Sequence, residues 1–166
     1  MKLRTICNSL IILNFLSLPV LAERITLPVF NEQSLPAACD NALAKAKQFA
    51  AQIETVSLAQ VTPANTLNAW NDLQIVLEDT VGPVDLQSNV HPDEKVRTAG
   101  EACLLKVTTY STDLYQNANL YQRVKKVKAE TPAQQRLRQD LLDGFDDSGV
   151  SLPPKKRARV KAIFDK

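Results

Sequence analysis

Two Thr-Pro pairs in this chain each open a stretch in which apolar residues recur every three or four positions. Threonine is a favoured N-cap, and proline fits the first helical position because an N–H there has no intrahelical partner. Thr62-Pro63 and Thr131-Pro132 therefore predict two helix starts. Only four glycines occur in 166 residues, which is few for an all-β protein that needs turns roughly every 8 to 12 residues. The pattern predicts an all-α fold.

We expect about six mostly antiparallel helices, because each apolar stripe is bounded by caps or breakers. They cover residues 34–56, 62–81, 91–114, 118–128, 131–147 and 154–166. Ser34 is the expected N-cap of the first helix, and Gly82-Pro83 should end the second because proline interrupts the helical hydrogen bonds. Residues 84–90 are then a connection of uncertain form. Gly100 is expected to mark a close contact between helices.

Residues 1–22 have the pattern of a secretory signal peptide. Lys2 and Arg4 form a positive start, Leu10–Leu21 is apolar, and cleavage is expected between Ala22 and Glu23. A membrane anchor is the alternative, but spanning a bilayer takes about 20 apolar residues and this run is shorter. We therefore expect an exported protein, in a bacterial periplasm or secreted, without a stable membrane span. Residues 23–33 form an extended lead-in, followed by one helical domain over residues 34–166.

Cleavage would also remove the net positive charge of the chain. The sequence has 20 Lys and Arg against 18 Asp and Glu, and residues 1–22 carry only Lys2 and Arg4. The remaining chain has 18 of each. Nucleic-acid binding is therefore not expected from the global charge.

Cys7 would leave with the leader, so that Cys39 and Cys103 remain. An even pair of cysteines in an exported protein suggests a disulfide, which would contribute about 4 kcal/mol on the chain-entropy model. The alternative is two small buried apolar residues, because both cysteines lie on apolar helix faces.

Four segments in order resemble the N-terminal helical region of the thimet oligopeptidase / oligopeptidase A family of zinc metallopeptidases. They are VTPANTLNAWNDL, SNVHPDEKVRTAGEAC, LYQRVKKVK and LRQDLLDGFDDSGVSLPP. The resemblance covers roughly residues 34–166. It implies a helical wall of a deep channel that admits short, unstructured peptides, with the zinc in a larger catalytic region further along the chain.

The zinc site of that family does not transfer to this chain. It requires H-E-x-x-H, and His91 is the only histidine here. His91 belongs to a helix start, so we carry over no catalytic or metal-binding residue. No cofactor is expected within these residues.

Two further groups of residues are interpreted as structural. The run from Pro154 to Lys161 resembles a nuclear-import or nucleic-acid patch, but we interpret it as a solvated helix face opposite Val160 and Phe164. Trp70 and Tyr110 fall on buried stripes and are assigned to the core, whereas Tyr115 and Tyr121 are left unplaced.

The sequence leaves two hypotheses. In the first, the chain is the N-terminal fragment of an exported zinc oligopeptidase, inactive alone, whose apolar face packs against the missing catalytic region. The apolar pattern of the last helix reaches Lys166 without a cap, and we accordingly expect truncation there. In the second, the chain is a free-standing exported helical module that binds peptides or a partner without catalysis.

Overall fold

The computed structural model of the protein describes residues 26–164, so the expected cleavage between Ala22 and Glu23 lies outside the described residues. Within this range the chain forms six α-helices and one π-helical turn and no strand, which confirms the all-α prediction. The elements are α1 (Ser34–Thr55), η1 (Ala64–Asn68), α2 (Ala69–Val90), α3 (Glu94–Tyr115), α4 (Ala118–Lys126), α5 (Pro132–Asp147) and α6 (Pro154–Phe164).

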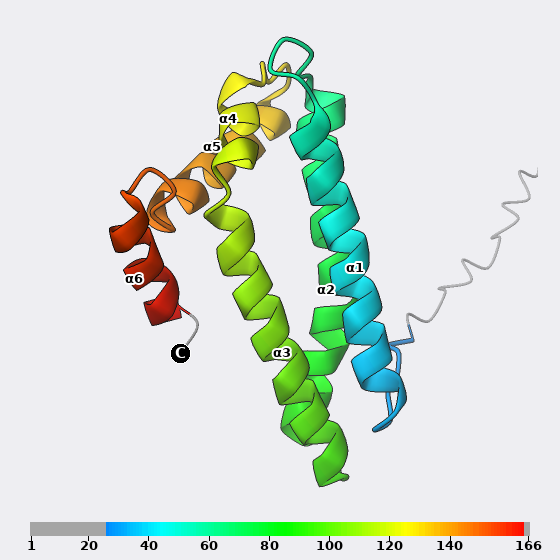
Figure 1. Ribbon diagram of the computed structural model, residues 1–166. Helices are drawn as coiled ribbons and strands as arrows, with labels where there is room; N and C mark the ends of the chain where they lie inside the picture. Colours follow the sequence, from blue (N-terminus) through cyan, green and yellow to red (C-terminus); the bar gives the residue numbers. More distant parts are fainter. Residues whose placement is uncertain (1–25, 165–166) are drawn as a thin grey trace, which may run out of the picture.

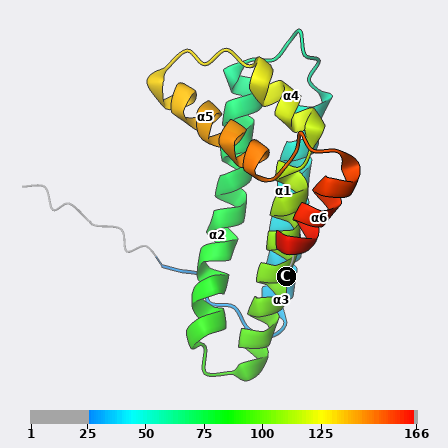
Figure 2. The same cartoon turned by 90° about the vertical axis from the view of Figure 1, so that its left-hand side faces the viewer.

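Three long antiparallel helices form the body of the protein. α1, α2 and α3 each have 22 residues, which makes each about 33 Å long. α2 packs against both α1 and α3, and α1 and α3 also contact each other (Figure 1). α4 and α5 lie across one end of the three helices, and α6 returns beside α3 (Figure 2).

One hydrophobic core joins α1 to α5. At its wider end an aromatic group packs edge to face, with ring centroids of Trp70, Tyr115 and Phe145 5.4–5.5 Å apart. Such aromatic pairs add about 0.5–1.5 kcal/mol beyond the area they bury. Other fully buried apolar side chains are Leu35, Cys39, Ala46, Ile53, Leu67, Leu73, Val84, Leu120 and Val124.

The two Thr-Pro helix starts occur as the sequence predicts. Thr131 Oγ1 accepts a hydrogen bond from the backbone N–H of Gln134, and the Gln134 side chain accepts one from the N–H of Thr131. Thr62 and Asn65 make the same reciprocal pair. Each pair satisfies two backbone donors that the first turn of a helix leaves open.

The start of α1 differs from the prediction, because Ser34 is not its N-cap. The Oδ1 atom of Asn31 accepts hydrogen bonds from the N–H groups of Gln33 and Ser34, while Ser34 Oγ accepts from the N–H of Asn31. Asparagine is as good a cap as serine. The capping pair therefore lies three residues earlier than the apolar pattern indicated.

The prediction that Gly82-Pro83 ends the second helix is wrong. α2 continues to Val90 with Pro83 inside it. The part of α2 beyond Pro83 is held by tertiary contacts: Val84 is fully buried, and the Gln87 side chain bonds the backbone of the lead-in. Gln87 accepts from the N–H of Phe30 and donates to the carbonyl of Pro28. Burial and these bonds outweigh the missing proline N–H.

The third and fourth helices are slightly shorter than expected. α3 begins at Glu94 rather than at His91, because the side chain of Asp93 caps it by accepting from the N–H of Lys95. α4 ends at Lys126 instead of residue 128, and Asn117 caps its start. Helix boundaries shift in this way when a capping side chain decides them.

Gly100 lies at a close contact between α2 and α3, as predicted. A Cβ atom built on Gly100 would be 2.8 Å from Ser88 Cβ and 3.3 Å from Ser88 Cα. The absence of a side chain at Gly100 therefore sets the spacing of these two helices at this level.

α6 is the least buried of the described helices. Val160 is half-buried, but Phe164 remains 52% exposed, so only half of the expected apolar side of α6 is covered. Among residues 26–164, no helix is long and apolar enough to cross a membrane.

Candidate functional site

A groove between α1 and α3 hollows the described surface, and both long helices line it. Its volume is about 640 Å³. α1 contributes side chains one helical turn apart, and α3 contributes the facing wall. The lining residues are Asp40, Leu43, Ala44, Lys47, Leu105, Lys106, Thr109, Tyr110 and Asp113. We call this hollow and its continuation the α1–α3 groove.

The α1–α3 groove continues toward α4 in a smaller hollow lined by Ala50, Ala51, Glu54 and Asn117. The two hollows share Lys47, Tyr110 and Asp113. From Asp40 to Glu54 the groove follows 14 residues of α1, which corresponds to about 21 Å. The small side chains of alanine keep its α1 wall low.

Two ion pairs border the α1–α3 groove. Lys106 Nζ lies 2.7 Å from Asp40 Oδ1 and joins α3 to α1, and Lys161 Nζ lies 2.8 Å from Asp113 Oδ1 and joins α6 to α3. Exposed ion pairs contribute about 0–1 kcal/mol each. They position side chains at the rim and add little to stability.

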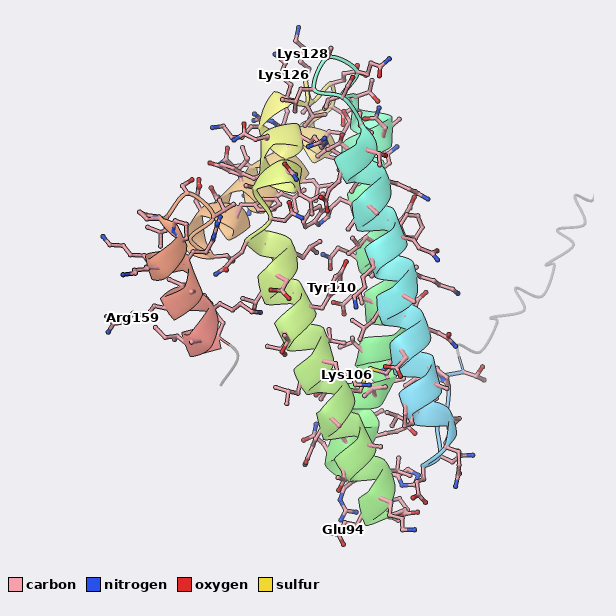
Figure 3. All side chains as sticks on the ribbon, in the orientation of Figure 1. Glu94, Lys106, Tyr110, Lys126, Lys128 and Arg159 are labelled. Atoms are coloured by element: carbon pink, nitrogen blue, oxygen red, sulfur yellow. A yellow bond between two sulfur atoms is a disulfide. The ribbon has the colours of Figure 1, made fainter. Side chains whose placement is uncertain are left out.

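Tyr110 is the polar residue set deepest in the groove. Figure 3 shows Tyr110 and Lys106 between α3 and α1. The hydroxyl oxygen of Tyr110 is buried and has no hydrogen-bond partner among the described residues. Burial, with a smaller contribution from the negative charge of Glu54, raises the pKa of Tyr110 to about 12. The hydroxyl is therefore neutral at physiological pH.

Two side chains, one midway along the groove and one at its α4 end, hold its walls in place. Lys47 Nζ lies 5.9 Å from the centroid of the Tyr110 ring, within the range of a cation–π contact. Asn117 caps α4 through Oδ1 and donates from Nδ2 to Glu54 Oε1 at 2.9 Å. Asn117 thereby ties α1 to the junction of α3 and α4.

Cys39 and Cys103 face each other across α1 and α3 near the Asp40 end of the groove. In the structure their sulfur atoms are bonded, with Cα atoms 5.9 Å apart. This separation lies within the range that disulfides require. The bond fixes the distance between the two helices at the end where the groove begins.

The structure places His91 in the turn between α2 and α3. Its Nδ1 accepts a hydrogen bond from the N–H of Asp93, and its carbonyl accepts one from Arg97. Within residues 26–164, no three or more His, Cys, Asp or Glu side chains are grouped so that they could hold a metal ion. His91 is accounted for as a turn residue.

The structure also places the aromatic residues and the basic run. Tyr115 belongs to the aromatic core, and the Tyr121 hydroxyl donates to Asp146 Oδ1 at 2.9 Å. Trp70 is buried as predicted, and Tyr110 packs partly buried against the core while it also lines the groove. On α6 the side chains of Lys155, Lys156 and Arg159 are exposed.

Sequence reasoning did not find the α1–α3 groove. Its α1 wall consists of residues such as Ala44 and Ala51, which are too small to give an apolar signal. One sign of the groove was available in the sequence. Leu105 is a large apolar residue that lies outside the buried face of α3, to which Cys103 belongs.

Comparison with known proteins supports a distant relationship to one oligopeptidase. The chain is 27% identical over 114 residues to a protein of Dictyostelium discoideum described as a thimet-like oligopeptidase. The matched part is 63% of this chain and 17% of the relative, so the match spans about a sixth of the length of that protein. No protein-family model matches the chain.

Proposed function

We propose that the chain is the helical, peptide-holding part of an exported oligopeptidase-type protein and that it has no catalytic activity by itself. The observation that carries this proposal is the 114-residue match to the thimet-like oligopeptidase. The four segments that resemble the oligopeptidase family fall on η1 and α2, the start of α3, α4, and α5 with the following turn.

The α1–α3 groove is the part of the surface that suits a short peptide. An extended chain advances about 3.3 Å per residue, so a groove of about 21 Å accommodates roughly six residues. Its walls carry apolar surface, chiefly from the exposed Leu105, and the polar side chains of Lys47 and Lys106 also line it. Most ligand sites combine apolar walls with a few fixed polar groups in this way.

Zinc, which the family resemblance implies, has no matching residues in this chain. H-E-x-x-H needs two histidines one helical turn apart, and the sequence contains only His91. The donor set therefore does not fit zinc, and no step of peptide hydrolysis is derived for these residues. Chemistry would require a second region or a second chain.

The outer face of α2 is the surface that we propose for contact with such a region. Ile75, Leu86 and Val90 lie on one side of α2, and each is at least 48% exposed. Spacings of 11 and 4 residues place side chains on the same side of a helix. A row of large exposed apolar residues is a common mark of an interaction surface.

A free-standing peptide-binding module is the second candidate function. It is favoured by the closed core and the groove, both of which form entirely within residues 26–164. This candidate predicts a stable monomer that binds peptides without any partner. The first candidate predicts that the exposed α2 face makes the protein associate, or that the protein requires a chaperone during expression.

Peptide binding and peptide hydrolysis should be measured separately on the purified chain. We expect fluorescent hexapeptides to bind and fluorogenic peptides to stay intact in the presence of zinc. Ala44→Arg, which fills the groove from an exposed position, should abolish binding, whereas Gln52→Arg, exposed on α1 but outside the groove, should not. Metal-dependent turnover that a chelator stops would refute the proposed lack of activity, and equal binding by both variants would refute the groove.

Export can be tested on the protein made in a bacterial host. We expect the protein recovered from the periplasm or medium to begin at Glu23, because Ala22 ends the predicted leader. Recovery of the full chain from the cytoplasm alone would contradict export.

A further inference from the structure

One concentration of positive charge lies around α4. Residues 118–138 contain six Lys and Arg but only one acidic residue, Glu130. Three more carboxylates lie at the same end of the molecule, Glu54 on α1, Asp72 on α2 and Asp140 on α5, and Asp140 is paired with Arg136. Six cations against four carboxylates leave this end positive although the chain without its leader is neutral.

The arginines of this region are occupied by the fold. Arg123 donates to the carbonyls of Val56 and Asn119, and Arg138 donates to the carbonyls of Val124 and Lys125. The carbonyls of Val56, Val124 and Lys125 lie at the C-terminal ends of α1 and α4, where cations offset the negative helix ends. The arginines thus have a structural role.

The lysines of this region have no such role. Lys126 and Lys128 are exposed and form no ion pair with any described residue. Lys125 is also exposed, and its Nζ lies 5.0 Å from the centroid of the Tyr121 ring. Figure 3 shows Lys126 and Lys128 together at one extremity of the molecule. Two solvated ammonium groups are therefore presented at this extremity.

An exposed apolar side chain lies in the loop next to these lysines. The loop of residues 56–62 joins α1 to η1 and carries no charged residue. The bond from Arg123 Nε to the carbonyl of Val56, 2.9 Å long, fixes this loop beside α4. Leu58 in this loop is 46% exposed. We call Leu58, Lys125, Lys126 and Lys128 together the α4 end.

The half of α2 and α3 that lies away from α4 is acidic. Residues 78–101 carry six carboxylates against two cations, and Glu94 lies at the far end from Lys126 in Figure 3. Charges of opposite sign at the two ends make the molecule an electric dipole along its long axis. A negatively charged surface would attract the α4 end and repel the other end.

The basic run on α6 has a smaller net charge around it. Residues 141–161 contain five cations and three carboxylates, and Asp113 of α3, which pairs with Lys161, is a fourth carboxylate. α6 therefore offers exposed lysines in a nearly balanced environment and serves as an internal comparison for the α4 end.

We propose that the α4 end is a docking surface for a membrane rich in anionic phospholipids. Lys125, Lys126 and Lys128 contact the phosphate groups, and Leu58 enters the interface between headgroups and acyl chains. This combination of cationic and apolar groups is the one that holds peripheral proteins on anionic bilayers. The long helices then stand away from the surface, and the α1–α3 groove remains open to solvent. The inference does not depend on peptide binding.

Sedimentation of the full chain with lipid vesicles tests this proposal. We expect binding to vesicles of phosphatidylcholine mixed with phosphatidylglycerol and none to phosphatidylcholine alone. Each lysine near such a surface contributes about fivefold in affinity, so Lys126→Gln with Lys128→Gln should weaken binding roughly 25-fold. Binding should fall with added salt, because the Debye length shrinks to about 8 Å at physiological ionic strength.

The matched control is Lys155→Gln with Lys156→Gln on α6, which removes the same charge from exposed positions. This variant should bind the mixed vesicles as the original chain does. An equal loss in both double variants would overturn the proposal, because only net charge would then matter. Unchanged binding of Leu58→Ser would overturn the insertion of Leu58.

Two competitors distinguish other anionic partners. Inorganic phosphate should not displace the chain from vesicles, and single-stranded RNA should bind more weakly than the mixed vesicles do. Displacement by phosphate would assign the α4 end to a soluble anion. Tighter RNA binding that depends on Lys126 and Lys128 would assign it to nucleic acid. Either result would overturn the membrane proposal.

Discussion

Replacement of Gly100 by alanine should destabilise the protein, although alanine is the better helix former. Within a helix, Gly to Ala gains about 1 kcal/mol. At Gly100, however, the new Cβ would stand 2.8 Å from Ser88 Cβ and 3.3 Å from Ser88 Cα. Both of these atoms are fixed to the α2 backbone, so α2 and α3 must separate.

The size of the effect follows from the two opposing contributions. Overpacking of a well-packed contact costs about 1–3 kcal/mol. After subtraction of the helix gain, Gly100→Ala should lower the free energy of unfolding by up to about 2 kcal/mol. For a domain of this size the melting temperature should fall by up to roughly 8 °C. Urea and thermal denaturation followed by far-UV circular dichroism measure both quantities.

A double-mutant cycle with Ser88 locates the cause. Ser88→Gly removes the Cβ that Gly100→Ala would meet, so the alanine should cost at least about 1 kcal/mol less in that background. Ser88→Ala keeps the Cβ, and in that background the cost should persist. If Gly100→Ala instead raised stability by about 1 kcal/mol, helix propensity would dominate and the close approach of α2 and α3 would be refuted.

Three further perturbations have defined outcomes. Cys39→Ser with Cys103→Ser should lower the free energy of unfolding by up to about 4 kcal/mol. Alkylation of the exported protein before reduction should label neither cysteine, and labelling of both would contradict the bond. Thr131→Ala should cost about 1 kcal/mol in urea denaturation, and an unchanged midpoint would show that the capping box is dispensable. Tyr110 has a raised pKa of about 12, so its contribution to stability should be complete below pH 10 and disappear as the pH rises toward 12. Tyr110→Phe should remove that part of the loss of stability at alkaline pH, and it should remove one late tyrosine ionisation from the ultraviolet titration. Burial also raises the pKa of Tyr115, so the ionisation of Tyr115 should persist.

Features set by neighbouring residues could be read from the sequence. The caps at Thr62 and Thr131 depend on side chains three residues apart, and the structure contains both. The apolar stripes gave the number of helices for the same reason, because a period of three and four residues describes one face of a helix.

Features set by distant residues could not be read in this way. Pro83 is a strong local signal for a helix end, yet α2 continues because Gln87 bonds a backbone segment 57 residues away. Tyr110 lies on the apolar face of α3, but whether that face meets a large side chain or an alanine depends on how α1 is aligned against α3. The groove therefore has no local signature.

The cross-link between Cys39 and Cys103 closes a loop that contains the whole of η1 and α2. A protease that cuts once in the loop of residues 56–62 or in the turn near His91 would leave every part of the chain covalently joined. Such a nicked protein would have the mass of the intact chain plus one water and would separate into pieces only after reduction. Even cuts on both sides of α2 would leave α1 bound to α3 while the central helix lost its covalent connection. Proteolytic maps of this protein therefore need to be read with and without reductant.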